Sequence, residues 1–470
     1  MIEKSVFAGW IAGLCCAASV AEPLPNFVVI FTDDQGYQDV GCFGSPDIQT
    51  PNLDQMASEG IRFTDFYVGA SVCTPSRAAL LTGRYPARYG MEKGVLFPKD
   101  KKGLPPAEKT IAEVLNQKDY ATACIGKWHL GHLDRFLPTA QGFDEYYGIP
   151  YSNDMWLAPE LKVADSLTLT HGMTREKMEQ LRGDRKGGKQ MVPLMRDNRV
   201  VEFPAEQTTL TRRYTEEAVR FIEANRNKPF FLYMTPAMPH VPLFASETFK
   251  GRSKAGLYGD TIEEIDWAVG EVLNCLKRNG LDENTFVVFT SDNGPWLKMN
   301  EFGGCALPLR NGKSTTYEGG MRVPCIMKMT GTLPVGRTCS APVSTLDLLP
   351  TFAAMAGINV EHTVDGVDIL PLMCADEQDD REREAFLYYN KSGQISAVRM
   401  GDWKLIFDNP ASGDSGWKAS RKKAGKGMKP ELYNLREDIG EQNNLAAAHP
   451  ERVEAMLARA RQEDRDVRRK

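Results

Sequence analysis

Four short runs of apolar and β-branched residues constrain the fold of this chain more than any other feature. Each run is continuous rather than alternating, which is typical of strands buried on both faces of a sheet. The runs are Asn26–Thr32, Tyr120–Ile125, Pro229–Met234 and Thr285–Thr290. Amphipathic helical segments lie between them, at Thr110–Asn116, Tyr214–Asn225 and Thr261–Asn279. Strands that alternate with helices predict an α/β fold with a largely parallel or mixed sheet.

Polar residues of the kind that bind ligands follow each of these runs. In chain order they are Asp33 and Asp34, then Lys127 and His129, then His240, and finally Asp292 and Asn293. Open α/β sheets bind ligands at the carboxyl ends of their strands, and adjacent carboxylates repel one another unless a cation or donors neutralise them. A solvated turn, a surface lysine or a structural histidine is the alternative at any single position. Because the pattern recurs at four strand ends, it predicts a cation-binding functional site.

A further segment, Cys73-Thr74-Pro75-Ser76-Arg77, predicts a nucleophile and a cation at the start of a helix. Pro75 suits the first turn of a helix, and Gly83 suits the left-handed position that ends one. A helix N-terminus presents free backbone N–H groups that favour an anion, and Arg77 lies one turn from Cys73 on the same face. The alternatives for Cys73 are a buried apolar side chain or half of a disulfide.

The run CTPSRAALLTGR, which begins at Cys73, resembles the signature of the type I formylglycine-dependent sulfatases. It is most similar to the arylsulfatase A and N-acetylgalactosamine-6-sulfatase branch. In this family the cysteine is oxidised to Cα-formylglycine. The strand ends match the family as well, and further similar segments extend the resemblance over nearly the whole mature chain: Gly148–Ser152, Arg310–Lys313, Tyr317–Gly320, Ala397–Ile406 and Asn443–Leu445.

The resemblance implies a role for each site residue. The implied metal ligands are Asp33, Asp34, the oxidised Cys73, Asp292 and Asn293. The implied catalytic residues are Cys73, Arg77, Lys127, His129, His240 and Lys313. Substrate contacts are implied for Ser152, Lys127, His240 and Lys313. An oxygen-rich shell suits a hard cation, so we expect one Ca²⁺ rather than Zn²⁺, whereas Mg²⁺ would demand tighter octahedral geometry.

The resemblance also implies a mechanism. The aldehyde at position 73 is hydrated, and one hydroxyl, activated by the cation, attacks the ester sulfur while cationic side chains offset the charge on the other oxygens. His240 or Lys313 would protonate the leaving oxygen, and a base such as His129 would deprotonate the second hydroxyl, which expels sulfate. An ordinary serine or cysteine has no second hydroxyl, so its sulfated ester would turn over slowly.

The expected substrate is a sulfated carbohydrate, with galactose or N-acetylgalactosamine favoured, or a small sulfate ester. A narrow pocket around one sulfate favours a terminal sugar. One alternative is a phosphatase or phosphodiesterase of the same superfamily, but it would need a Thr or Ser nucleophile and a two-zinc His/Asp set. Another is a protein that binds sulfated glycans with Cys73 unmodified, because the oxidation depends on a separate formylglycine-generating maturation enzyme.

The implied fold is an alkaline-phosphatase-like large mixed sheet flanked by helices, with a smaller C-terminal α+β domain that contains a short antiparallel sheet. Residues 1–21 resemble a signal peptide, since Lys4 precedes the apolar run Val6–Val20 and small residues follow. We expect a catalytic domain at 22–375, a C-terminal domain at 376–470, and an exported product in the periplasm, a lumen or the medium. An uncleaved membrane anchor is the alternative to this soluble product.

Composition bears on the choice of partner and on the pairing of the cysteines. A formal net charge of −5 gives no support for a nucleic-acid partner. The ten cysteines fall to seven after loss of the signal peptide and oxidation of Cys73, so they cannot all pair, and their spacing predicts no zinc site. Two polar segments, Leu161–Val200 and Ser412–Lys429, are interpreted as solvated loops or as rim loops that select the substrate.

Overall fold

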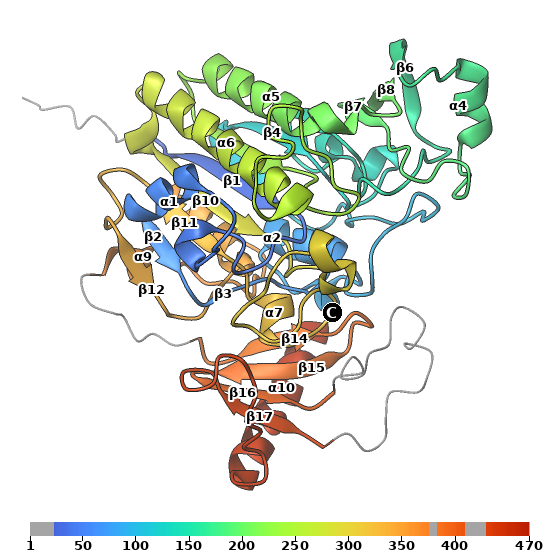
Figure 1. The fold of residues 1–470 in the computed structure, drawn as a ribbon. Helices are drawn as coiled ribbons and strands as arrows, with labels where there is room; N and C mark the ends of the chain where they lie inside the picture. Colours follow the sequence, from blue (N-terminus) through green and yellow to red (C-terminus); the bar gives the residue numbers. More distant parts are fainter. Residues whose placement is uncertain (1–22, 376–382, 409–428, 470) are drawn as a thin grey trace, which may run out of the picture.

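A computed structural model describes residues 23–375, 383–408 and 429–469 (Figure 1). The expected signal peptide and all but the last residue of the Ser412–Lys429 segment lie outside the described residues. Within the described ranges, none of the helices combines the length and the apolar character that crossing a membrane requires.

An eleven-stranded mixed sheet forms the centre of the larger part of the molecule, in the order β12-β2-β11-β10-β1-β9-β4-β5-β7-β8-β6. Its five middle strands are parallel: β10 (Thr285–Ser291), β1 (Asn26–Thr32), β9 (Phe230–Thr235), β4 (Ala121–Gly126) and β5 (Glu145–Gly148). Four of these strands are the predicted apolar runs, which confirms the α/β interpretation. Because parallel strands end at the same edge, the polar residues that follow them converge there.

The outer strands were harder to predict. On one side lie β11 (Cys325–Lys328), β2 (Ile61–Phe63) and β12 (Arg337–Cys339), and on the other lie β7 (Leu194–Arg196), β8 (Arg199–Phe203) and β6 (Lys162–Leu169). The interpretation of Leu161–Val200 as loops is therefore wrong, since the segment holds β6, α4 (Arg175–Leu181), β7 and the start of β8. Most residues of β6 are at least partly exposed, so this edge strand lacks the apolar pattern of a buried one.

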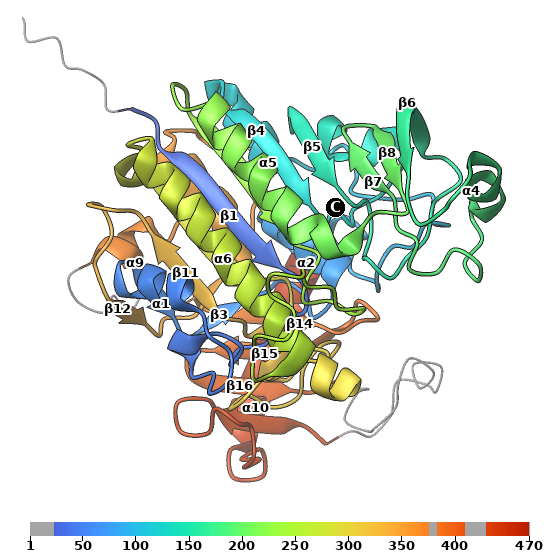
Figure 2. The ribbon, with the colours of Figure 1, turned by 45° about the horizontal axis from the view of Figure 1, so that its top comes forward.

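Helices cover both faces of the sheet. One group comprises α2 (Cys73–Thr82), α3 (Ile111–Leu115) and α8 (Leu348–Met355), and the other comprises α1 (Pro51–Ser58), α5 (Leu210–Ala224) and α6 (Gly256–Arg278). Phe27, Val29 and Phe31 of β1 belong to the core on the α2 side. Val28 and Ile30 belong to the core beneath α5 and α6, which run across the sheet in Figure 2. Strand β1 is thus buried on both faces, as predicted.

The C-terminal part forms a separate four-stranded antiparallel sheet, seen in orange and red at the bottom of Figure 1. Its strands are β14 (Phe386–Tyr389), β15 (Ile395–Met400), β16 (Trp403–Ile406) and β17 (Glu431–Asn434), and α10 (Pro450–Arg468) packs against it. The expected α+β unit with a short antiparallel sheet is confirmed. The remaining strands and α-helices are β3 (Phe66–Tyr67), β13 (Val343–Ser344), α7 (Glu318–Met321) and α9 (Leu370–Cys374). Short 3-10 helices lie at Gly41–Phe43, Pro86–Arg88, Asn116–Lys118, Asp134–Phe136, Pro138–Ala140, Gln207–Thr209, Asp282–Asn284, Leu297–Phe302 and Thr345–Asp347.

Eight of the ten cysteines lie in the described ranges, and all eight are free thiols. This agrees with the prediction of at most a few disulfides. Cys73 is 2% exposed and unpaired, so the alternative in which it forms half of a disulfide is not the one found.

Candidate active site

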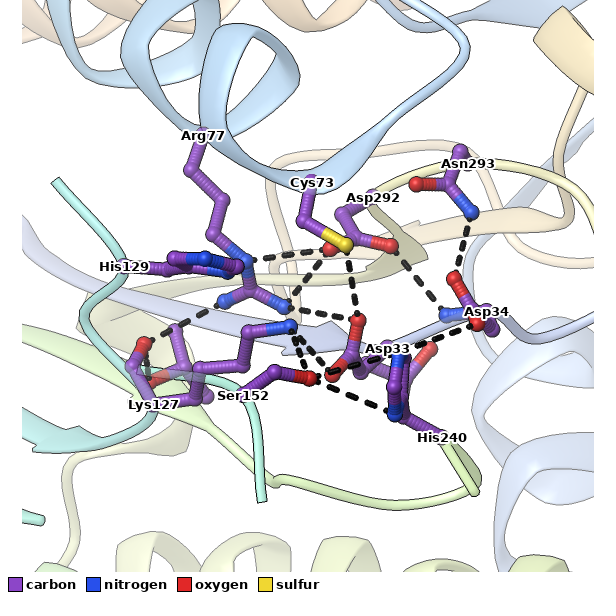
Figure 3. Close-up of polar contacts among 12 residues, drawn as sticks. Asp33, Asp34, Cys73, Arg77, Lys127, His129, Ser152, His240, Asp292 and Asn293 are labelled. Atoms are coloured by element: carbon purple, nitrogen blue, oxygen red, sulfur yellow. Dashed lines mark hydrogen bonds and ion pairs between the residues drawn. The ribbon is translucent and has the colours of Figure 1, made fainter. Parts of the chain in front are cut away.

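Helix α2 carries the first two site residues. It begins at Cys73, as predicted, after the extended residue Val72, and it ends at Gly83, whose φ of 63° is left-handed. All ten residues of the helix are buried. Figure 3 shows Cys73 and Arg77 projecting from the helix toward the aspartates at the strand ends.

Carboxylates from β1 and β10 meet at the start of this helix. One ligand atom from each of Asp33, Asp34, Cys73 and Asp292 lies within 4.8 Å of the others. The Sγ of Cys73 is 3.5 Å from Asp33 Oδ1, and the backbone N–H of Asp34 donates to Asp292 Oδ1 at 3.1 Å. Asp34 has a φ of 64°, a conformation that costs a non-glycine residue on the order of 1 kcal/mol and persists where the surroundings enforce it.

Three cationic side chains surround these carboxylates. Arg77 donates from Nε to Asp292 Oδ2 at 3.0 Å. Lys127 Nζ is 2.5 Å from Asp33 Oδ2, and Lys313 Nζ is 2.6 Å from Asp34 Oδ2. Arg77 and Lys127 are wholly buried, and the Lys313 side chain is only 9% exposed. The charges therefore interact with one another far more strongly than they would in water.

His240 and Ser152 form the opposite wall. The Oγ of Ser152 is 3.3 Å from the His240 ring and 3.4 Å from Lys127 Nζ. The His240 Nδ1 is 3.1 Å from Asn153 Oδ1 and 2.6 Å from Val241 O, both of which accept. Nδ1 thus carries the proton, and Nε2 is the nitrogen that faces Asp34, at 3.7 Å.

A backbone carbonyl also fixes the tautomer of the second histidine, His129. Its Nε2 lies 2.8 Å from the carbonyl oxygen of Leu96, while its buried Nδ1 has no partner. Since a carbonyl can only accept, Nε2 carries the proton and Nδ1 offers a lone pair. Burial, with Lys127 adding, lowers the pKa of His129 well below its ordinary value, so the ring is neutral at physiological pH.

Burial also sets the charge of the groups in the centre. It raises the pKa of Asp292 to about 7, with Asp33 contributing. Burial acts in the same direction on Asp33, but Lys127 and His240 outweigh it and hold that pKa well below its ordinary value. The pKa of the Cys73 thiol is raised by burial, with smaller opposing effects from Lys127 and Lys313. Cys73 is therefore a neutral thiol at physiological pH.

The pocket fits a hard divalent cation. The Oδ1 of Asn293 is buried without a partner, whereas its Nδ2 donates to Asp34 Oδ1 at 2.7 Å and to Gly294 O at 2.9 Å. A buried amide oxygen beside three carboxylates normally has a donor or a cation as its partner. An oxygen-only set of this kind suits Ca²⁺.

The sulfatase family model matches residues 25–358, and the model for the C-terminal region of aryl-sulfatase matches residues 381–470. The chain belongs to the sulfatase family. A third model, the C-terminal part of N-sulphoglucosamine sulphohydrolase, matches residues 311–411.

Individual relatives support this sulfatase assignment along nearly the full chain. Arylsulfatase A of Homo sapiens is 41% identical, and the match covers 94% of this chain and 88% of that protein. N-acetylgalactosamine-6-sulfatase of Mus musculus is 38% identical over 83% of this chain and 72% of that protein. Among solved structures, Ps i-CgsB in complex with k-i-k-neocarrahexaose is 32% identical, with a TM-score of 0.76, and covers 94% of this chain and 92% of that one. This protein is therefore an enzyme that hydrolyses sulfate esters.

The structure of the sulfatase brings every predicted site residue into one pocket, although their individual roles stay predictions. The residues are Asp33, Asp34, Cys73, Arg77, Lys127, His129, Ser152, His240, Asp292, Asn293 and Lys313. Two orienting groups were missed: Asn153 beside Ser152, and the Leu96 carbonyl. Only the position of Asn153 next to Ser152 could have indicated it.

The loop of Lys313 is held by the C-terminal part of the sulfatase, which the sequence did not predict. Arg310 donates to the backbone oxygen of Glu441 at 2.8 Å, and the N–H of Glu318 donates to the Glu441 carboxylate at 2.8 Å. Glu441 thus fixes both ends of the loop. Lys404 Nζ lies 2.8 Å from Glu318 Oε1 and 2.9 Å from Glu441 Oε1, and all three side chains are 0% exposed.

Proposed function

We propose that this sulfatase removes sulfate from sulfated carbohydrates through a formylglycine at position 73 and a bound calcium ion. The observation that carries the proposal is the meeting of Cys73 with three carboxylates, an unpartnered amide oxygen and three cations in one buried pocket. Such a pocket combines a cation site with donors for an anion. A sulfate ester needs both next to the attacking atom.

The state of the thiol supports a modified residue. A nucleophilic or metal-binding cysteine acts as the thiolate, but the raised pKa of Cys73 keeps its proton on. In the hydrated aldehyde two hydroxyls would replace Sγ, and one of them would lie toward Asp33. The first hydroxyl attacks sulfur, and the second allows the sulfated intermediate to break down with release of sulfate.

The chain's own cations would bind the non-bridging oxygens of the sulfate. Arg77, Lys127 and Lys313 are already ordered by aspartates, so they need little reorganisation when negative charge develops in the transition state. Calcium, when held by Asp33, Asp34, Asp292 and Asn293, would add a further positive charge at the nucleophile and the sulfate.

His129 has the tautomer that its proposed proton transfer needs, whereas His240 does not. The neutral His240 ring presents an unprotonated Nε2 to the pocket, and burial, with Lys313 adding, lowers its pKa. His240 would therefore donate to the leaving oxygen only after gaining a second proton, whereas the neighbouring Lys313 already carries protons to donate. His129 presents an unprotonated Nδ1, which suits a base that removes the proton of the second hydroxyl. Ser152, between His240 and Lys127, would contact the substrate.

The relatives guide the choice of substrate. One is named for N-acetylgalactosamine 6-sulfate, and one solved neighbour holds a neocarrahexaose, which is a six-sugar chain. We infer a galactose or N-acetylgalactosamine sulfate, cleaved at the terminal sugar because the pocket encloses the ester. We further propose that the enzyme is exported after loss of residues 1–21. The mature chain would then consist of a catalytic domain at 22–375 and a C-terminal domain at 376–470. A separate maturation enzyme would oxidise Cys73.

Peptide mass spectrometry of the segment around Cys73, taken from active enzyme, tests the proposal. We expect the mass of the aldehyde in a fraction that matches the active fraction. An intact, alkylatable thiol throughout a fully active preparation would contradict the mechanism. A panel of end-labelled galactose-type and glucosamine-type sulfated oligosaccharides tests the substrate, and desulfation of internal residues alone would contradict the terminal-sugar assignment.

A further inference from the structure

The backbone of one short loop decides where the ammonium of Lys313 lies. Lys313 Nζ is 2.6 Å from Asp34 Oδ2 and 4.7 Å from the centroid of the Trp296 ring. The backbone N–H of Ser314 donates at 2.9 Å to the oxygen of Ser71, just before the helix that begins at the nucleophile. The loop therefore runs between the carboxylates and the start of α2, and a shift of its backbone would carry the ammonium with it.

This loop needs outside support, because its own conformation is unfavourable. Asn311 and Ser314, which flank Lys313, have φ values of 60° and 71°. A left-handed conformation costs a non-glycine residue on the order of 1 kcal/mol and persists where the surroundings enforce it. The loop closes where the N–H of Gly319 donates to the oxygen of Arg310 at 2.9 Å. The contacts at these two ends therefore decide whether the loop keeps its shape.

The C-terminal sheet holds the first end of the loop through Arg310. Its Nη1 donates to Tyr433 Oη at 3.0 Å and to the oxygen of Glu441 at 2.8 Å. Its guanidinium carbon lies 4.0 Å from the centroid of the Tyr317 ring, near the other end of the loop. One side chain thus connects both ends of the loop to the C-terminal part. It is 34% exposed, so replacing it does not remove a fully buried group.

The same sheet holds the second end. The Oη of Tyr317 donates at 2.9 Å to Oε2 of Glu431, the first residue of β17. The next residue, Glu318, begins α7, which lies against the C-terminal sheet in Figure 1. Its N–H donates to the Glu441 carboxylate at 2.8 Å. Lys313 thus lies between two ends that residues of the C-terminal part fix in place.

We propose that the C-terminal sheet positions the ammonium of Lys313 for catalysis, and that Arg310 is the positioning residue through which it acts. A displacement of about 1 Å in a catalytic group can cost on the order of 100-fold in rate, so an anchor at the end of the loop affects a reaction that it does not contact. The inference rests on the proposed role of Lys313 at the sulfate and the leaving oxygen, and it extends the active site into the second part of the fold.

A double-mutant cycle between Arg310 and Lys313 tests the proposal, with para-nitrophenyl sulfate as substrate. Arg310→Met should lower kcat about tenfold. In the Lys313→Met background the same change should alter kcat by less than about twofold, because no ammonium is left to position. Arg310→Lys keeps the charge, so it should recover part of the loss. Each kcat is taken per mole of enzyme that carries the aldehyde, so that a change in maturation is not counted.

The matched control is Arg88→Met, because Arg88 also joins the larger part to the C-terminal part. Its Nε donates to Asp365 at 2.7 Å, and its Nη1 donates at 3.2 Å to the oxygen of Asp466 in α10. Its side chain is 13% exposed, so it is more buried than that of Arg310, and these contacts do not involve the loop of Lys313. Any effect of Arg88→Met on kcat should therefore be the same with and without Lys313.

Inorganic sulfate gives a second measurement that needs no turnover. On Cys73→Ala protein, calorimetry should show weaker sulfate binding in Arg310→Met, and no further loss once Lys313 is replaced by methionine. Misfolded protein would lower the stoichiometry of binding rather than raise the dissociation constant. The sulfate cycle thus separates a misplaced ammonium from a smaller amount of folded protein.

An unchanged kcat in Arg310→Met, or a loss of equal size with and without Lys313, would overturn the proposal. Failure of the proposed function would look different. Phenyl sulfate has a poorer leaving group than para-nitrophenyl sulfate, so a misplaced proton donor should cost more on it. Equal losses on the two esters, with the coupling retained, would support the positioning by Arg310 and contradict only the role of Lys313 as proton donor. If the unmutated enzyme hydrolysed neither ester nor sulfated galactose, the proposed function would be wrong, and the sulfate cycle would decide on Arg310.

Discussion

Replacing Lys404 by methionine should destabilise the contact between the two sheets of the sulfatase. Lys404 lies within 3 Å of both Glu318 and Glu441, and all three side chains are fully buried. Without it, Glu318 keeps Arg322 at 3.4 Å. Glu441 keeps the N–H of Glu318 but loses its cation.

The expected loss follows from leaving a buried carboxylate unpaired. Removing one partner of a buried ion pair costs about 3–5 kcal/mol, although desolvation makes the pair itself weakly stabilising. Burial already raises the pKa of Glu441 to about 7 against the pull of Lys404, and the variant should raise it further. A carboxyl whose folded pKa exceeds its unfolded one loses stability as pH rises between the two. The deficit of Lys404→Met should therefore be larger at pH 8 than at pH 5.

Urea unfolding at these two pH values measures the effect, with sulfate release as a check on the native state. Lys250→Met is the matched control, because Lys250 is 61% exposed and pairs with an 86% exposed Glu247 at 3.6 Å, a contact worth about 0–1 kcal/mol. Lys404→Met/Glu441→Gln should recover part of the loss. A loss no greater than that of the control, or one that does not grow with pH, would refute this reasoning.

Three further changes probe the site itself. Arg77→Lys keeps the charge but loses the fork that contacts Asp292, so steady-state kinetics should show kcat lower by about 100-fold; an unchanged kcat would contradict its role. His129→Gln should lower kcat by about 100-fold or more, and in the unmutated enzyme activity should fall only at pH values below the ordinary pKa of histidine, because burial lowers the pKa of His129. Chelation should abolish activity and lower the melting temperature, and added calcium should restore both. Free calcium at 1,000 times its Kd would raise the free energy of unfolding by about 4 kcal/mol. Active enzyme that contains only zinc would contradict the oxygen-ligand assignment.

The centre of the fold and of the site was predictable because both follow from local sequence. The four apolar runs match β1, β4, β9 and β10 to within a residue at each end, and the polar residues after them meet because parallel strands end together. The CTPSR segment begins a helix at Cys73, and the left-handed Gly83 ends it, as their residue types require.

What the sequence did not predict depends on distant contacts. Strand β6 lies at the edge of the sheet and has no buried residue, so its pattern resembles that of a loop. Strands β7 and β8 are short, and each carries an exposed arginine beside its buried residues. The contacts of Glu441 with Arg310 and Glu318 join residues more than 100 positions apart, and no local pattern marks them.

The contacts of Glu441 can form only after nearly the whole chain has been synthesised. Cys73 is made early, whereas the residue that holds both ends of the Lys313 loop is made near the end of the chain. In the finished protein Cys73 is 2% exposed, which leaves its thiol out of reach of another enzyme. We therefore expect the proposed oxidation to occur on the growing or unfolded chain, and a natively folded thiol form to resist conversion by added maturation enzyme. The last stretch of sequence would then be what closes the period in which the enzyme can be activated.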